Sequence, residues 1–382
     1  MKSKKVLIFK EVEEMHEGKL RIRRMRPGEE KIVRSIVKEA FPFTAWLFFN
    51  HKPTTLVAVK ENKIVAGVVY GQFAYSKDIN SGAIYWLFTA PEHQGEGFGK
   101  KLIQEAVNKL KVGGCQEVFA CIEGYNSSSF NLFDKQDFSK LNFFDQIKKF
   151  RIETFYIWYQ THHLFDLGHY LWHLNIKESE KETKNELREN RNKFKDIKFW
   201  LFNLTISSLI MFIALLRTDL IDINPGDITA VFFAIVVTFG IRDLAGIVAA
   251  KGSGLKLEYD IWESGHIISI IMAVFAGGYI PVPGTFYPEG DDWSYQNKLT
   301  GLARQSLASS GALLVLGWIL NFDFISGIKF IEILLMAVTN MAIFDIALPF
   351  FPFVSYNGSR IWDYNRIIWL VLFITLIGFI VF

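Results

Sequence analysis

The sequence predicts an α+β domain followed by an all-α, multi-pass membrane domain of about six helices. Charge supports this division, because 33 of the 42 Lys and Arg residues and 25 of the 39 Asp and Glu residues precede Phe199. The last 184 residues keep only 9 basic and 14 acidic side chains and contain apolar runs of near-spanning length. We therefore expect an N-terminal extension, an α+β domain, a charged helical linker and a membrane domain, at residues 1–19, 20–161, 162–198 and 199–382.

The first half alternates patterns typical of strands and helices. A turn at Glu61-Asn62-Lys63 separates the first two strand-like segments, and a glycine-rich turn, Gln94-Gly-Glu-Gly-Phe-Gly99, separates the third strand from an amphipathic pattern. The expected elements are strands over 55–59, 64–73 and 83–89, a helix over 99–110 and a strand over 117–122.

The glycine-rich turn has the composition of an anion site. Gly95, Gly97 and Gly99 carry no side chains, so successive backbone N–H groups are able to face an anion. The helix that follows adds the positive end of its dipole. A glycine cluster alone is also typical of a plain turn, but its place between a strand and a helix favours binding of a pyrophosphate.

The order of elements resembles the GNAT superfamily of acetyl-CoA-dependent N-acetyltransferases. The likeness extends over about residues 20–160 and depends on Gln-x-x-Gly-x-Gly at 94–99 and on Asn-x-x-small-x-x-Leu-aromatic-x-Lys-x-x-Phe at 126–138. The resemblance implies a mixed central sheet flanked by helices, with acetyl-CoA as cosubstrate and no metal. It assigns the cosubstrate to the turn, to the backbone of the preceding strand and to the second motif, that is, to Phe88, Thr89, Ala90, Gln94, Gly95, Glu96, Gly97, Phe98, Gly99, Lys100, Asn126 and Phe133.

The catalytic residues depart from the family pattern. Acetyl transfer needs a base for the amine proton and an acid for the leaving thiolate. The usual Tyr is Phe133 here, and the position where some relatives carry a Glu base is Cys121. The nearest substitutes are Glu123, Tyr125 and Tyr85, each of which also fits a structural or surface role. A thiolate leaves without an acid more readily than most groups, so loss of the Tyr does not exclude catalysis.

Six apolar runs in the second half predict the membrane helices. They lie at 199–216, 228–250, 266–280, 306–320, 331–348 and 367–382, against the roughly 20 residues that span a bilayer. Lys193, Lys195 and Lys198 precede the first run, whereas Asp219 and Asp222 follow it. By the positive-inside rule, the α+β domain lies on the cytoplasmic side of the cell membrane.

The membrane half resembles the archaeal-type site-2 intramembrane metalloproteases. The stretches that carry the likeness are 239–246, 340–345 and 349–360, with Phe286 between them. The zinc-site residues of that family are replaced, by Arg242, Asp243, Gly246 and Asn357. His266 is the only His after residue 198, so His ligands for a catalytic zinc are lacking and proteolysis is excluded. An unrelated helical anchor remains the alternative interpretation.

An arginine in a spanning helix has to face a partner or reach an interface. If the likeness holds, Arg242 approaches Asn357, with Asp345, Glu263 and the Asn357 carbonyl as candidate partners. Asp243 is a poor candidate on this reasoning, because adjacent helix residues do not face each other.

The linker contains a possible metal cluster. If residues 164–174 form a helix, Asp166, His169 and His173 share a face, with His162 near the same line. The favoured alternative is an interfacial helix whose aromatic residues lie among the lipid headgroups.

Together these observations predict a membrane-anchored N-acetyltransferase with a proteolytically inactive membrane domain. The expected partners are an amine acceptor of unassigned type (a protein N-terminus, a lysine or a small amine), the lipid bilayer and transmembrane helices of other proteins, with no nucleic acid. The alternative is a non-enzymatic protein that senses acetyl-CoA or docks partners.

Overall fold

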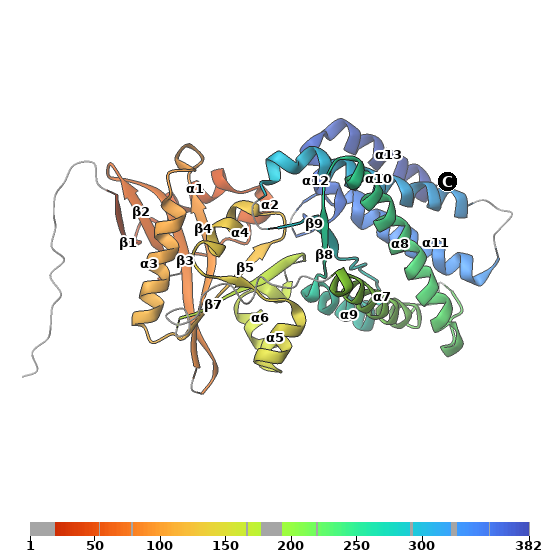
Figure 1. Cartoon of the computed structure of the whole chain (residues 1–382), viewed down its shortest axis with the longest axis horizontal. Helices are drawn as coiled ribbons and strands as arrows, with labels where there is room; N and C mark the ends of the chain where they lie inside the picture. The colour runs from red at the N-terminus through yellow and green to blue at the C-terminus, as the bar shows by residue number, and fades with distance from the viewer. Residues whose placement is uncertain are drawn as a thin grey trace, which may run out of the picture.

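The structure is a computed structural model, and it describes residues 20–52, 54–77, 79–165, 167–176, 193–218, 221–290, 293–321, 327–350 and 352–381. A twisted sheet with its helices forms one half of the molecule, and a bundle of long helices forms the other (Figure 1). The two halves predicted from the charge distribution are therefore distinct in the structure.

A seven-stranded sheet of order β1-β2-β3-β4-β5-β7-β6 forms the centre of the first half. Only the β4–β5 pair is parallel, and the other neighbours are antiparallel. The expected mixed sheet is thus confirmed. Its strands are β1 (Arg21–Arg24), β2 (Leu56–Lys60), β3 (Lys63–Ser76), β4 (Ile79–Thr89), β5 (Glu117–Glu123), β6 (Ser139–Lys140) and β7 (His169–Asn175).

Helices cover both faces of this sheet. On one face, α3 (Phe98–Val112) buries Leu102, Ile103 and Ala106 against Val68 and Val118. The other face is covered in two parts, by α1 (Glu30–Ala40) with α2 (Phe43–Trp46), and by α5 (Phe143–Phe150) with α6 (Glu153–Gln160). Short α4 (Ser127–Asp134) follows β5, and the 3-10 turns η1 (Pro91–His93) and η2 (His163–Phe165) follow β4 and α6.

The expected strands and the helix after the glycine turn are confirmed, but the helix expected over 164–174 is wrong. That segment contains η2 and then β7, which pairs with β5 along its whole length, from Glu117–Asn175 to Glu123–His169. The five central residues of β7 are all buried. A strand buried on both faces shows no alternation of polar and apolar residues, so periodicity alone does not identify it. The sheet therefore continues beyond the expected domain boundary at 161.

The second half is helical. Each of the six apolar runs overlaps a helix, although the run 266–280 extends beyond the end of α9 at Ala276. A two-stranded sheet of β8 (Leu257–Asp260) and β9 (Thr285–Pro288) accompanies the helices. The 3-10 turn η3 (Pro225–Asp227) leads into α8, and the helices are α7 (Lys193–Leu215), α8 (Ile228–Gly252), α9 (Glu263–Ala276), α10 (Tyr295–Leu320), α11 (Lys329–Ala347), α12 (Asn357–Tyr364) and α13 (Arg366–Val381).

Three segments of the described chain are long and apolar enough to cross a membrane, against the six that the sequence predicts. They are Asp196–Leu215, Pro225–Gly252 and Lys329–Ala347. Helices α9 and α13 are apolar but shorter. Helix α10 has the length, with 26 residues, but it begins with a polar turn and contains Lys298 and Arg304. The six apolar runs therefore predict the helices correctly and overestimate the number of candidate spans.

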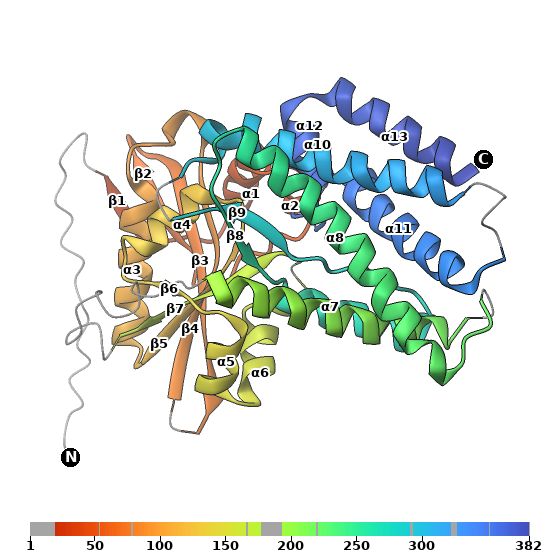
Figure 2. The same ribbon diagram turned by 45° about the vertical axis from the view of Figure 1, so that its right-hand side comes forward.

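The two-stranded β8–β9 sheet lies between the large sheet and the helical bundle (Figure 2). Lys140 of β6 pairs with Asp260 of β8, and Gln146 of α5 donates a hydrogen bond of 2.8 Å to Glu263 of α9. Tyr125, just after β5, packs 4.7 Å from Tyr287 of β9, measured between ring centroids. The second half thus covers the carboxyl end of β5, close to the residues that the sequence proposes for catalysis.

Candidate active site

The glycine turn has the backbone conformation that its sequence requires. φ is 84° at Gly95 and 81° at Gly97, in the left-handed region where a side chain is strained. Gly97 immediately precedes α3, and no side chain caps that helix end. Gly99 is required by close packing rather than by its backbone conformation, because a Cβ there would lie 2.9 Å from Leu132 Cδ2 of α4. The first N–H groups of α3 and its dipole therefore offer an anion site.

The side chains of the turn leave this helix end clear. Glu96 accepts hydrogen bonds from Lys60 Nζ at 2.7 Å and from His93 Nδ1 at 2.8 Å. The bond from Lys60 is the main cause that lowers the pKa of Glu96. Phe98 is buried and anchors the turn, while Gln94 and Lys100 are exposed. The one carboxylate in the turn is thus held by a neighbouring strand.

Strands β4 and β5 diverge beside this turn. Their parallel pairing extends from Ser81–Glu117 to Ile84–Ala120, and β4 continues to Thr89 paired with β3 on its other side. Among the described residues, the β5-facing edge of 85–89 has no strand partner. The Phe88 side chain is buried against Phe49, so only its backbone is available to a ligand. The Ala90 N–H already donates to the Val65 carbonyl at 2.8 Å.

The two residues expected from the later motif have structural roles. Asn126 Oδ1 accepts from the Ser129 N–H at 3.0 Å and so caps α4. Phe133 is 3% exposed and packs 5.0 Å from Phe138, between ring centroids. It lies in the core and has no proton to give.

This combination of a strand, a glycine turn and a helix start agrees with the comparison to known families. Residues 22–138 match the acetyltransferase (GNAT) family. The N-terminal half contains a GNAT acetyltransferase domain. No match was found among curated proteins.

Solved acetyltransferase structures also align with this GNAT domain. The NatC complex bound to Gag peptide and CoA aligns at 17% identity over 41% of this chain and 98% of that chain, with a TM-score of 0.32. The PaiA N-acetyltransferase from Thermoplasma acidophilum, in complex with coenzyme A, aligns at 14% identity over 41% of this chain and 99% of that chain, with a TM-score of 0.30. The ribosomal-protein-S18-alanine N-acetyltransferase from Escherichia coli aligns at 12% identity over 41% of this chain and 94% of that chain, with a TM-score of 0.31.

Tyr85 lies on the GNAT domain face opposite α3, where β4 bulges against β3 between Tyr70 and Val69. Lys52 Nζ lies 3.4 Å from the centroid of its ring, and the His162 ring is 5.2 Å away. Burial raises the pKa of Tyr85 to about 12 and lowers the pKa of Lys52. Tyr85 is therefore protonated at neutral pH and is able to donate a hydrogen bond here.

Glu123 and Tyr125 lie at the boundary between the two halves. Ser355 Oγ donates to Glu123 Oε1 at 3.3 Å, and burial raises the pKa of Glu123. The Arg360 guanidinium carbon lies 4.2 Å from the centroid of the Tyr125 ring. Tyr125 is 6% exposed, among aromatic residues of the second half. The three proposed catalytic residues thus divide into Tyr85 on one face and, at the boundary, the partly buried Glu123 with the buried Tyr125.

Sequence reasoning missed a further cluster. Cys121 Sγ lies 3.2 Å from His163 Nδ1, and His163 Nε2 lies 3.7 Å from Glu263 Oε1. The sequence drew attention to Cys121 only as a replacement for a base. Glu263 is 100 positions beyond His163 in the numbering, in α9 of the other half, so no local pattern joins them.

The proposed metal cluster of the linker is not formed. His169 and His173 lie on β7, and the His162 ring is tilted against the Tyr85 ring, while Asp166 lies outside the described residues. His173 Nε2 is instead 3.4 Å from Glu117 Oε1. In the part of the chain that the structure describes, no three His, Cys, Asp or Glu residues are placed to hold a metal.

In the helical half, Arg242 is bonded to Asp345, one of the three candidate partners that the sequence offers. Its Nε and Nη2 donate to Asp345 of α11 at 2.8 and 3.0 Å. Asn357 Nδ2 donates to the same carboxylate at 2.6 Å, so Arg242 and Asn357 meet through Asp345. Glu263, another candidate, bonds Gln146 instead. The exclusion of Asp243 is wrong, because Arg242 Nη1 donates to Asp243 Oδ1 at 2.8 Å: the long Arg side chain turns back along its own helix.

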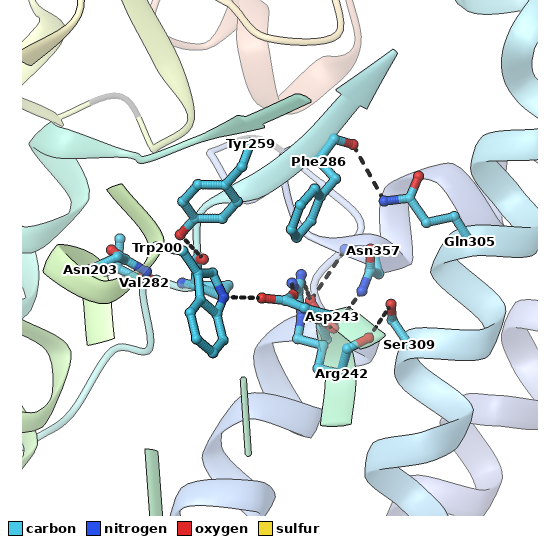
Figure 3. Close-up of polar contacts among 12 residues, drawn as sticks. Trp200, Asn203, Arg242, Asp243, Tyr259, Val282, Phe286, Gln305, Ser309 and Asn357 are labelled. Carbon is cyan, nitrogen blue, oxygen red and sulfur yellow. Dashed lines mark hydrogen bonds and ion pairs between the residues drawn. The ribbon is translucent and has the colours of Figure 1, made fainter. Parts of the chain in front are cut away.

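This cluster continues on both sides. Trp200 Nε1 of α7 donates to Asp243 Oδ2 at 2.8 Å (Figure 3), and Arg360 Nη2 donates to Asn357 Oδ1 at 2.8 Å. Because Arg360 also covers Tyr125, a chain of buried polar groups joins α8 to the GNAT domain. A cavity of about 300 Å³ adjoins its outer end and is lined by Asp196, Ile197, Trp200, Gly240, Asp243, Leu244, Ile247, Tyr259 and Phe286.

Proposed function

We propose that this protein is a membrane-anchored N-acetyltransferase that transfers acetyl from acetyl-CoA to an amine. The observation that carries the proposal is the GNAT match over residues 22–138, with an uncapped helix start at the glycine turn beside two diverging strands. The pyrophosphate of the cosubstrate lies on residues 94–100. Its pantetheine arm follows the free backbone edge of β4 at Phe88 and Thr89, with Asn126 at its side.

The acceptor enters on the face opposite α3. Tyr85, Lys52 and His162 gather there beside the end of the β4–β5 pairing. The lowered pKa of Lys52 and the exposed imidazole of His162 suit the transfer of an amine proton. We propose an amine nucleophile on chemical grounds, since an unprotonated amine attacks a thioester directly.

The helical half anchors the enzyme, with its GNAT domain on the cytoplasmic side. Three apolar segments of spanning length support the anchor, and Lys193, Lys195 and Lys198 in the first turns of α7 support the orientation. We also propose that this half is a site-2-protease-like fold that neither binds zinc nor cleaves peptides. Arg242 and Asn357 bonded to one carboxylate support this likeness, because a guanidinium then occupies the position of the metal. Stoichiometric, chelator-sensitive zinc in the purified protein would contradict it.

Acetyl-CoA binding tests the proposal on the full chain in detergent. Gly97→Glu brings a side chain and a negative charge to the start of α3, and calorimetry should show loss of binding. Gly114→Glu is a matched control, because Gly114 also has positive φ (83°) and open space around its Cβ position but lies after α3. Equal binding by wild type and Gly97→Glu would refute the placement of the cosubstrate.

A second candidate function is a non-enzymatic acetyl-CoA sensor or docking protein. The burial of Phe133 favours it, since the position of the usual Tyr offers no acid. Incubation with acetyl-CoA and a broad amine panel separates the two functions. Release of CoA with formation of an acetylated amine supports the enzyme, whereas binding without turnover supports the sensor.

A further inference from the structure

Cys121, His163 and Glu263 form a linear series of side chains at the boundary between the two halves. The distances are 3.2 Å from Cys121 Sγ to His163 Nδ1 and 3.7 Å from His163 Nε2 to Glu263 Oε1. The sulfur is within hydrogen-bond reach of the imidazole, and the carboxylate lies on the opposite side of the ring. This is the order of groups that activates a nucleophile: thiol, base and a carboxylate that orients the base.

The imidazole is held in a fixed orientation. His163 is 0% exposed, and its ring meets the Trp158 ring edge-on at 4.9 Å between centroids. Trp158 Nε1 donates to Gln146 Oε1 at 2.6 Å, and Gln146 Nε2 donates to Glu263 Oε1 at 2.8 Å. Gln146 thus ties the ring that contacts His163 to the carboxylate that faces it.

One polar atom in this series is left over. Among the described residues, His163 Nε2 is buried and makes no hydrogen bond, since Glu263 at 3.7 Å is beyond that range. A buried nitrogen without a partner is costly and rare in a purely structural role. When the imidazole takes up a proton, the same nitrogen faces a carboxylate, and the contact is able to shorten.

Cys121 stands at the point where a thioester would arrive. The β4–β5 pairing ends at Ile84–Ala120, and Cys121 is the next residue of β5. The free edge of β4 leads from there to the glycine turn. Cys121 is partly exposed, whereas Cys115, the other cysteine, is 5% exposed and burial raises its pKa. The two thiols on one domain therefore differ in access and in partner.

We propose that Cys121 accepts the acetyl group from acetyl-CoA to form a covalent acetyl-cysteine, with His163 as its base and Glu263 as the residue that positions His163. This inference rests on the acetyl-CoA chemistry proposed above. It replaces direct transfer within a ternary complex by two steps.

In the first step, His163 takes the thiol proton and Cys121 Sγ attacks the carbonyl carbon. The new Sγ–C bond forms, the C–S bond to coenzyme A breaks, and its thiolate leaves with the proton from the imidazolium. Backbone N–H groups on the unpaired edge of β4 are the available donors to the developing oxyanion.

In the second step, the amine nitrogen attacks the carbonyl carbon of acetyl-cysteine. The N–C bond forms, the Sγ–C bond breaks and its electron pair returns to Cys121. His163 carries one amine proton to that thiolate. The sum is acetyl-CoA plus amine giving CoA plus N-acetylamine, and no further reactant is needed.

An exchange experiment tests the first step without knowledge of the acceptor. Full-length protein is mixed with acetyl-CoA and isotopically labelled CoA in the absence of amine. A covalent acetyl-enzyme makes label appear in acetyl-CoA, and acid quenching followed by peptide mass spectrometry should place one acetyl group on Cys121. Cys121→Ser should reduce the exchange by more than about a hundredfold, and Cys115→Ser, the matched control, should retain it.

Folding is checked separately, by acetyl-CoA calorimetry on each variant. A Cys121→Ser protein that binds acetyl-CoA and exchanges at the wild-type rate overturns the inference. So does a wild-type protein that binds acetyl-CoA or acetylates an amine without exchange. Failure of the wild-type protein to bind acetyl-CoA contradicts the proposed function instead. Exchange of labelled CoA without acetylation of any amine contradicts the transferase function but supports the formation of acetyl-cysteine.

Discussion

The clusters around Arg242 and around His163 both contain buried charged groups, and their hydrogen bonds are completed to different degrees. In the helical half, Arg242 makes three hydrogen bonds to Asp345 and Asp243, and both carboxylates have additional donors. At the boundary, His163 has a sulfur on one side and a carboxylate at 3.7 Å on the other. A completed network favours one protonation state and one geometry. The incomplete one leaves the buried Nε2 of His163 without a hydrogen bond.

The sharpest test of the completed cluster removes its central carboxylate. Asp345→Ala leaves Arg242 buried and unpaired on that side, and we expect unfolding to become easier by about 3–5 kcal/mol. Denaturant titration in detergent measures this. The triple variant Arg242→Met/Asp243→Asn/Asp345→Leu should recover most of the loss, because it removes the charge of Arg242 and of both carboxylates that Arg242 bonds. If Asp345→Ala alone is neutral, the cluster does not hold the helices together.

A smaller loss is expected from the edge of the same cluster. Trp200→Phe removes the N–H that reaches Asp243, and a hydrogen bond to a charged group contributes about 1.5–3 kcal/mol. Trp172→Phe on β7 is a matched control, since its buried Nε1 has no hydrogen-bond partner among the described residues. Equal losses in the two variants would show that packing, and not the bond to Asp243, explains the effect.

In the incomplete cluster, Glu263→Gln should change activity more than stability. We expect kcat/KM to fall about tenfold, or about 1.4 kcal/mol, while the bond from Gln146 is retained. The carboxylate faces the imidazole and orients it toward Cys121, so its removal should lower kcat while KM for acetyl-CoA is unchanged. A fall in stability as large as the fall in kcat/KM would indicate a merely structural carboxylate.

The smallest expected effect concerns Glu123. Burial raises the pKa of Glu123 above its usual 4.5, so the folded state binds this proton more tightly than the unfolded state. The stabilisation of the fold by protonated Glu123 is complete below the pKa of this carboxyl in the unfolded state, and it is lost as the pH rises through the higher pKa of the folded state. At neutral pH, the charge of the carboxylate therefore destabilises the fold. Glu123→Gln should be slightly more stable than wild type at pH 7 and equal at pH 4. A variant less stable at pH 7 would show that Ser355 and Arg360 compensate for the burial.

The sequence predicts the regular parts of the GNAT domain well. Strands with alternating or apolar patterns and the helix after Gly97 follow from local rules, and the left-handed φ values there follow from glycine itself. The partner of Arg242 is also predictable, because a charge in an apolar helix needs an opposite charge.

What the sequence does not predict depends on tertiary packing. β7 is buried on both faces, so His169 to Asn175 shows no alternation. The bond between Arg242 and Asp243 depends on the reach of a long side chain rather than on helix geometry. The approach of Glu263 to His163 requires the two halves to be docked, and no local pattern contains that information.

The central position of β7 also bears on how the chain is synthesised. β7 pairs with both β5 and β6, so β6 has no place in the sheet until residue 175 has left the ribosome. Only residues 176–192 separate that point from α7, the first apolar helix. Because domains fold from the N-terminus during translation, completion of the sheet and the emergence of α7 from the ribosome are close in time. A ribosome that stalls just before β7 therefore exposes an unfinished sheet, in which β6 has no partner strand.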